Sequence, residues 1–325
     1  MRVVIVNVPT LPNHPHRVFY VPDNLVSAFH IFKGRNVDRV IKTLERELGN
    51  SRIWIDSGGF QILKMGVDIK LDELIAWYRK LEDIAYIYFS LDYPPQDNDD
   101  KKVAAKKFEA SYQNWLKLEK AFGDRVIPVV HNYPQDLSLY YKYLERYVDE
   151  HSVKRLAIGK VVQYTSRRNE LLVGVMRLIY KTRMLFKGHL HVLGMGSPSL
   201  LSTLDAMGVD TTDSSSWIQR CFTGQLLMPG GATLYVSIRQ ERHREMTTQE
   251  LAHVYEFLAR TGFPDLYDFA RRVVSDKAYR CAVNAWISMK SRELPISPFY
   301  RRLYYAVVTG EIMSDDFKLN GSEEE

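Results

Sequence analysis

Short apolar runs alternate with longer amphipathic stretches along most of this chain. The short runs are rich in β-branched and aromatic side chains, which is typical of buried strands. They cover residues 1–6, 53–55, 84–91, 126–130, 155–158, 189–193 and 209–212. The longer stretches carry apolar residues at helical spacing and cover residues 71–81, 102–122, 137–148 and 170–184. This alternation predicts a parallel sheet with helices outside, either a doubly wound sheet or a (β/α)8 barrel.

Two further features favour the barrel. No Gly-x-Gly-x-x-Gly follows the first strand, which disfavours a dinucleotide-binding doubly wound sheet. Polar or glycine positions gather where the apolar runs stop, at Asp56, Asp92, His131, Gly159, Lys160, Gly194 and Asp213. Because the carboxyl ends of all strands in a barrel converge on one mouth, we predict a (β/α)8 TIM-like barrel.

The C-terminal part has a different pattern. From about residue 246 to residue 312 the sequence is mainly helical, with Thr247 and Thr248 as candidate caps at its start. Residues 320–325 are expected to be a disordered tail. No linker or internal repeat divides the chain, so residues 1–325 are expected to form a single domain.

Composition excludes a membrane-spanning protein. The chain is 46% hydrophobic and 26% charged, and no apolar run approaches the roughly 20 residues that a bilayer requires. The N-terminus has the pattern of a first strand and not of a signal peptide, so a cytoplasmic location is expected. Cys221 and Cys281 are about 60 positions apart and are expected to be reduced thiols, with no cofactor or metal.

The net charge of +5 is compatible with a polyanionic partner. Basic residues near aromatic ones are the candidates for phosphate contact, namely Arg167, Arg168, Arg239, Arg242 and Arg244. Each such cluster also has a plain alternative, a solvated helix face.

The segment from Asp56 to Gln61 reads Asp-Ser-Gly-Gly-Phe-Gln directly behind an apolar run. It places a carboxylate at the end of a strand, and Gly58 and Gly59 let the backbone turn sharply against a flat ligand. Phe60 offers a ring face for that ligand. Taken alone, the pattern is equally that of a turn that simply ends a strand.

The order of the strand-end motifs carries a family resemblance. After the Asp56 segment come Phe-Ser-Leu-Asp at 89–92, Ala-Ile-Gly at 157–159, His-Val-Leu-Gly-Met-Gly-Ser-Pro at 191–198 and Gly-Val-Asp-Thr-Thr-Asp at 208–213. Over residues 53–216, roughly half of the chain, this series resembles the tRNA-guanine transglycosylase superfamily. Members of that family exchange a guanine in a nucleic acid for a 7-deazaguanine on a (β/α)8 barrel, which makes them pentosyltransferases.

The resemblance implies roles for individual residues. Asp213 matches the nucleophile that attacks C1′ of the target nucleotide, and Asp56 matches the general acid and base. Asp92 matches the carboxylate that reads the amidine edge of the purine. The implied base-binding set is Ser57, Gly58, Gly59, Phe60, Gln61, Asp92, His131, Gly159, Lys160, Gly194 and either Leu193 or Met195.

The chain also departs from the family pattern. The zinc site of three cysteines and a histidine has no counterpart in a chain with two cysteines. His131 and Lys160 stand where many members have a glutamine and a Gly-Gly-Leu loop, which leaves the incoming base open. Residues 214–217 lack the Pro-Thr-Arg of bacterial members and are nearer to the archaeal tRNA enzymes and to relatives that modify DNA. Since the archaeal tRNA enzymes have extra C-terminal RNA-binding domains for which this chain lacks the length, DNA is slightly favoured over tRNA.

Other readings stay open at this point. The chain could be a non-catalytic nucleic-acid-binding partner subunit of such an enzyme, or a barrel glycosidase or nucleoside hydrolase. Asp92 could cap a turn, His131 could be a structural rim residue and Lys160 could form a rim salt bridge, while Asp210 is expected to be structural. Whether the protein pairs with itself as a homodimer is undecided.

Overall fold

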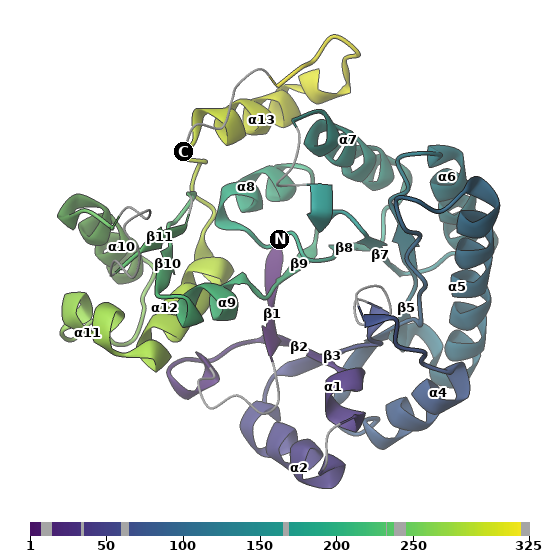
Figure 1. The fold of residues 1–325 in the computed structure, drawn as a ribbon, viewed down its shortest axis with the longest axis horizontal. Coiled ribbons are helices and arrows are strands. Elements are labelled where there is room, and N and C mark those ends of the chain that lie inside the picture. Colours follow the sequence, from purple (N-terminus) through teal and green to yellow (C-terminus); the bar gives the residue numbers. More distant parts are fainter. Residues whose placement is uncertain are drawn as a thin grey trace.

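The fold is described from a computed structural model that covers residues 1–7, 15–33, 36–59, 65–164, 169–231, 233–236 and 245–319. A ring of parallel strands lies at its centre, with helices around it (Figure 1). The strands are β1 (Arg2–Asn7), β2 (Asp23–Ser27), β3 (Arg52–Asp56), β4 (Ala85–Phe89), β5 (Val126–Ile127), β6 (Val129–His131), β7 (Arg155–Gly159), β8 (His189–Val192) and β9 (Thr211–Ser214).

The ring closes through one interrupted strand. The nine strands follow the order β5-β4-β3-β2-β1-β9-β8-β7-β6, so β5 and β6 are its two ends. Only Pro128 separates these two in the chain, and a proline has no N–H to contribute to a ladder. β5 pairs with β4 and β6 with β7, and the Pro128 carbonyl still accepts from Ala157 N at 2.9 Å. Counting β5 and β6 as one strand gives eight, and the predicted (β/α)8 barrel is confirmed.

Helices follow the strands in the predicted alternation. They are α1 (Ala28–Phe32), α2 (Val37–Leu48), α4 (Leu71–Lys80), α5 (Lys101–Phe122), α6 (Leu137–Glu145), α7 (Asn169–Leu185), α8 (Pro198–Ala206) and α9 (Ser216–Phe222), with single turns η1 (Pro15–Arg17), η2 (Gly123–Arg125), η3 (Arg146–Glu150) and η4 (Val162–Tyr164). The apolar faces of α1 to α8 pack on the outside of the barrel in the largest hydrophobic core, whereas the buried residues of α9 belong to a second core. Among these helices, none combines the length and apolarity that crossing a bilayer requires, and the same holds for every helix in the described residues.

The C-terminal part contains one hairpin and four helices among the described residues. These are β10 (Gln225–Leu227), β11 (Thr233–Tyr235), α10 (Thr248–Arg260), α11 (Phe269–Ser275), α12 (Lys277–Lys290) and α13 (Pro298–Thr309), followed by the turn η5 (Glu311–Met313). Thr247 caps α10 in a capping box with Glu250, which confirms the predicted helix start. Helices α9 to α12 lie together at one side of the barrel, and α13 returns to pack on α8 (Figure 1).

Helix α12 packs against the first strand of the barrel. Between β1 and β2 the only helix in the described residues is η1, and α12 packs against both β1 and η1. Its polar side chains satisfy neighbouring backbone: Asn284 Oδ1 accepts from Leu227 N at 2.8 Å, and Arg280 Nε donates to Cys221 O at 3.0 Å. A second core forms around this contact, separate from the one outside the barrel.

The expectation of reduced cysteines is wrong. Cys221 on α9 and Cys281 on α12 are joined in a disulfide, and both are fully buried in the second core. A separation of 60 positions in the chain says nothing about distance in space once α12 folds back onto α9. The disulfide therefore ties the helix that follows β9 to the C-terminal helices.

Candidate functional site

Side chains alternate between the two faces of each strand. This alternation points the predicted site residues into the barrel at its carboxyl end. Trp54 and Val129 belong to the apolar cluster that fills the interior. Asp56 and His131 lie two positions further along the same strands, β3 and β6, and successive residues of a strand face opposite sides. Asp56 and His131 therefore stand above this interior layer, as residues of a barrel mouth do.

Asp56 is a partly buried carboxylate at the end of β3. Gly58 N donates to its Oδ2 at 3.1 Å, so the turn after the strand folds back on it, with Gly58 at φ 103°. Burial, together with the negative charges of Asp92 and Asp213, raises the pKa of Asp56 to about 7. A carboxyl group with this pKa can both give and take a proton near neutral pH.

Asp92 follows β4 and is 6% exposed. Ser57 Oγ donates to its Oδ1 at 3.3 Å, and His131 Nε2 lies 2.9 Å from its Oδ2. Gly159 at the end of β7 leaves room for the imidazole, since a Cβ there would stand 2.6 Å from His131 Nδ1. The structure thus brings Ser57, Asp92, His131 and Gly159 together, with His131 as a direct neighbour of the carboxylate.

Asp213 lies on β9, is 8% exposed and accepts two hydrogen bonds on one oxygen. Gly194 N donates to Oδ1 at 2.7 Å, and His191 Nε2 lies 3.2 Å from the same atom. Gly196 N donates to the Asp213 carbonyl at 3.0 Å, and a Cβ on Gly196 would meet Ser214 Cβ at 2.5 Å. The Gly-Met-Gly segment after β8 is therefore a turn that packs its backbone on Asp213.

Lys160 forms a salt bridge at the rim of the barrel, which is one of the two roles that the sequence left open for it. Its Nζ lies 2.7 Å from Asp97 Oδ1, and its side chain is 1% exposed between the rings of Tyr133 and Tyr164. Burial lowers the pKa of Lys160, and the bond to Asp97 offsets part of that effect. The backbone at Lys160 has φ 55°, so this turn after β7 is held in a conformation that few non-glycine residues adopt.

Leu193 and Met195, the two alternatives in the implied base-binding set, differ in burial. Met195 is 1% exposed and belongs to the core outside the barrel. Leu193 is half-buried against the interior cluster, directly after β8. Phe60, Gln61, Arg167, Arg168, Arg239, Arg242 and Arg244 lie outside the described residues.

Sequence reasoning assigned no role to His191 or to Thr211, and the structure places both beneath Asp213. A signal was present: His-x-His at 189–191 and Thr-x-Asp at 211–213 occupy adjacent strands with period two. Because His191 and Thr211 are register partners, all four polar side chains face the same side of the sheet.

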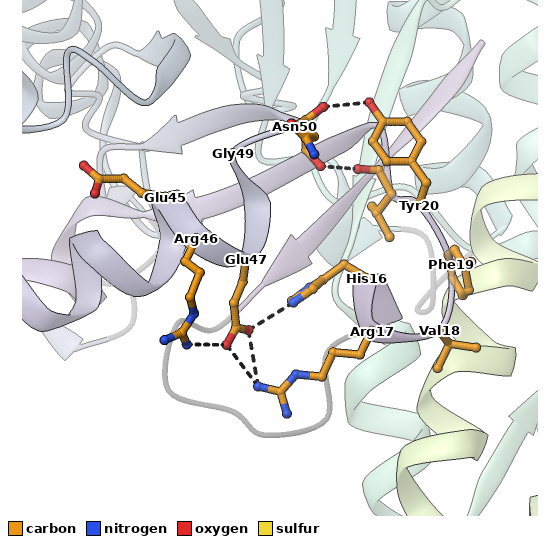
Figure 2. A pocket seen from close by; sticks show the side chains of 12 residues that line it. His16, Arg17, Val18, Phe19, Tyr20, Glu45, Arg46, Glu47, Gly49 and Asn50 are labelled. Carbon is orange, nitrogen blue, oxygen red and sulfur yellow. Dashed lines mark hydrogen bonds and ion pairs between the residues drawn. The ribbon is translucent and has the colours of Figure 1, made fainter.

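Within the described part of the chain, no cluster of three His, Cys, Asp or Glu residues could hold a metal ion. Cys221 and Cys281 are bonded to each other and do not fit a zinc site. A hollow of about 410 Å³ opens between η1 and the end of α2 (Figure 2). It lies beside the amino-terminal ends of β2 and β3, away from Asp56, and the His16, Arg17 and Arg46 side chains there converge on Glu47.

Fold and site together define a TIM-like barrel with three carboxylates at its mouth. No protein-family model matches the chain. It is 29% identical over 235 residues to an uncharacterized protein 306 of Sulfolobus islandicus rod-shaped virus 1, covering 72% of this chain and 69% of that protein.

Two further relatives carry a functional name. The chain is 29% identical over 177 residues to the tRNA-guanine(15) transglycosylase of Sulfolobus acidocaldarius, covering 52% of this chain and 34% of that enzyme. It is 28% identical over 208 residues to the enzyme of the same name in Pyrobaculum aerophilum, covering 61% of this chain and 40% of that enzyme. The matched region is thus less than half of each transglycosylase, and this distant homology supports a relationship to the tRNA-guanine transglycosylase superfamily.

Proposed function

We propose that this protein is a base-exchange transglycosylase that replaces a guanine in a polynucleotide by a 7-deazaguanine. The observation that carries the proposal is a pair of carboxylates at one mouth. Asp213 accepts two hydrogen bonds on Oδ1, while burial and neighbouring charge raise the pKa of Asp56 to about 7. Distant homology to two tRNA-guanine transglycosylases supports the same reaction class.

In the first half-reaction, Asp213 attacks C1′ of the target nucleotide while the bond from C1′ to the guanine nitrogen breaks. Asp56 in its acid form gives a proton to the departing base, and a glycosyl ester to Asp213 remains. In the second half-reaction, the incoming base loses a proton to Asp56 and its nitrogen bonds to C1′, which releases Asp213. A group with a pKa near 7 suits both directions of this proton transfer.

Asp92 is the residue proposed to recognise the purine. A carboxylate has two acceptor oxygens, so it can accept hydrogen bonds from both the ring N–H and the exocyclic amine of guanine. No other type of side chain offers two acceptor oxygens side by side. Ser57 and His131 hold Asp92 on its two oxygens, at 3.3 and 2.9 Å. We further propose that Leu193, half-buried against the barrel interior, contacts one face of the base.

The polynucleotide is proposed to be DNA in preference to tRNA, because a chain with two cysteines lacks the zinc-ligand set of the standard tRNA enzymes. The test is an exchange assay with radiolabelled guanine and either duplex DNA or bulk tRNA, together with detection of a denaturant-resistant adduct. Asp213→Asn should abolish exchange and adduct alike. Asp210→Asn is the matched control, since Asp210 pairs with Arg183 at 3.0 Å at the other end of β9 and is not part of the mouth.

Three outcomes contradict the proposal in different ways. An adduct that persists in Asp213→Asn rejects the nucleophile. Nucleic-acid binding without exchange by the wild type favours the non-catalytic partner subunit. Release of free base from nucleosides alone favours a nucleoside hydrolase.

A further inference from the structure

A column of four polar side chains runs down the inside of the barrel from Asp213. Asp213 Oδ1 lies 3.2 Å from His191 Nε2, and His191 Nδ1 lies 2.9 Å from Thr211 Oγ1. The same hydroxyl lies 2.8 Å from His189 Nε2. The column therefore alternates between β9 and β8, with each contact at hydrogen-bond distance.

The surroundings of the column are apolar. His191 and Thr211 are both fully buried, and the rings of Trp54 and Phe89 lie 5.3 and 5.1 Å from the His191 ring. A polar group buried among such side chains needs a partner, because an unpaired one carries its full desolvation cost. His191 finds its two partners inside the column, one on each ring nitrogen.

The chemistry of the members sets the direction of every hydrogen bond. An ionised Asp213 only accepts, so His191 Nε2 must carry the proton, and its Nδ1 must then accept. Thr211 has a single hydroxyl proton, which it gives to His191 Nδ1, so its oxygen accepts from His189 Nε2. His189 is suited to the neutral form, because burial lowers its pKa to about 4, and it lines a hollow of about 180 Å³ at the amino-terminal end of the barrel.

The two hydrogen bonds that reach the Asp213 carboxylate, from Gly194 N and from His191, both go to Oδ1. Among the interactions of the described residues, Oδ2 receives none. We propose that His191, with its tautomer set by Thr211 and His189, is a positioning residue that holds Oδ1 and presents Oδ2 of Asp213 as the attacking oxygen. This inference rests on the proposed role of Asp213 as nucleophile.

Thr211 offers a matched pair of variants for the test. Thr211→Val keeps the shape and the strand preference but removes the proton that sets the tautomer, whereas Thr211→Ser keeps the hydroxyl. Proton–nitrogen NMR correlations of ¹⁵N-labelled protein report the tautomer of His191. Single-turnover adduct formation reports the chemical step, and titration with the nucleic acid reports binding separately.

In the wild type and in Thr211→Ser, we expect the Nε2–H tautomer of His191 and the same rate of adduct formation. In Thr211→Val, we expect a mixture of His191 tautomers and adduct formation slower by about tenfold or more. Removing the residue that hydrogen-bonds the second nitrogen of a metal-bound histidine has an effect of this size on activity. Affinity for the nucleic acid should be unchanged, because Thr211 does not reach the mouth.

An Nδ1–H tautomer in the wild type overturns the inference, whether or not the protein forms an adduct. So does a Thr211→Val variant with wild-type tautomer and rate, or a Thr211→Ser variant as slow as Thr211→Val. If the wild type forms no adduct although His191 is in the Nε2–H tautomer, the proposed function is wrong. The hydrogen-bond column is then correct, but Asp213 is not a nucleophile that it could position. The two failures are therefore distinguishable.

Discussion

Gly59 lies so close to Asp92 that a Cβ at Gly59 would stand 2.8 Å from both carboxylate oxygens. Real Cβ atoms do not approach oxygens at that distance. A side chain at residue 59 would therefore force the Asp92 carboxylate to move from its observed position. The second glycine of the Asp-Ser-Gly-Gly turn thus has a steric reason, which is to let the backbone lie against the proposed purine-reading residue.

Gly59→Ala should therefore displace Asp92 and weaken base recognition. We expect KM for guanine to rise by about tenfold to a hundredfold, since shifts of about 1 Å at positioning groups have effects of this size. Gly174→Ala is the control: Gly174 is exposed on α7 with open space around it. That variant should leave KM unchanged and stabilise the helix by roughly 0.5–1 kcal/mol. An unchanged KM in Gly59→Ala contradicts the role of Asp92.

Asp56 should make stability depend on pH. Its pKa in the folded protein is about 7, above the ordinary value of 3.8, so between these values the folded state binds more protons than the unfolded state. Stability contributed by this group is full below about pH 4 and is lost as pH rises through 7. Asp56→Asn should then raise the free energy of unfolding at pH 8 by about 2 to 4 kcal/mol and leave it nearly unchanged at pH 4.

Denaturant unfolding of Asp56→Asn and wild type at both pH values measures this difference. The same variant should lose base exchange, because an amide does not transfer the proton. Equal stability of the two proteins at pH 8 shows that Asp56 titrates normally and removes the argument for its acid and base role.

The disulfide should contribute strongly to stability. Cys221 and Cys281 enclose a loop of 60 positions, for which the chain-entropy argument gives about 4 kcal/mol. Cys281→Ser should lower the free energy of unfolding by about this amount. A reductant should lower wild-type stability to the level of the variant and leave the variant itself unchanged. Two titratable thiols in denatured, unreduced wild type contradict the pairing.

Zinc removal should have no effect. With two cysteines in the chain, both in the disulfide, the C-terminal helices are expected to fold without a structural metal. A chelator should change neither the melting temperature nor base exchange. Stoichiometric zinc in the purified protein is the result that speaks against this.

Salt should weaken binding of the nucleic acid. If Arg167 and Arg168 contact phosphates, log affinity falls with log salt at a slope of roughly 0.7 to 0.9 per phosphate, and replacing both by Ala lowers that slope by about 1 to 2. These two residues follow β7 in the chain but lie outside the described residues, so the prediction rests on the sequence. Affinity that is indifferent to salt and to both substitutions points to a small-molecule substrate.

The sequence by itself determined the elements whose pattern is local. The apolar residues of β3 are consecutive, those of β8 alternate with histidines, and Thr247 with Glu250 forms a capping box within four residues. Strand β2 was not predicted, because it begins with the polar residues Asp23 and Asn24. Asp23 is buried only because Arg2, Arg52 and Trp54 reach it from neighbouring strands, and no local pattern records such partners.

The carboxylates at strand ends were also readable, since a barrel brings all such ends to one mouth whatever its details. What only the tertiary structure decided is which of these groups touch. His131 against Asp92, Lys160 against Asp97, His191 beneath Asp213 and Cys221 bonded to Cys281 all join residues at least 22 positions apart. Hydrogen bonds, ion pairs and disulfides depend on distances of a few ångströms, and only closure of the barrel and the return of α12 bring these residues that close.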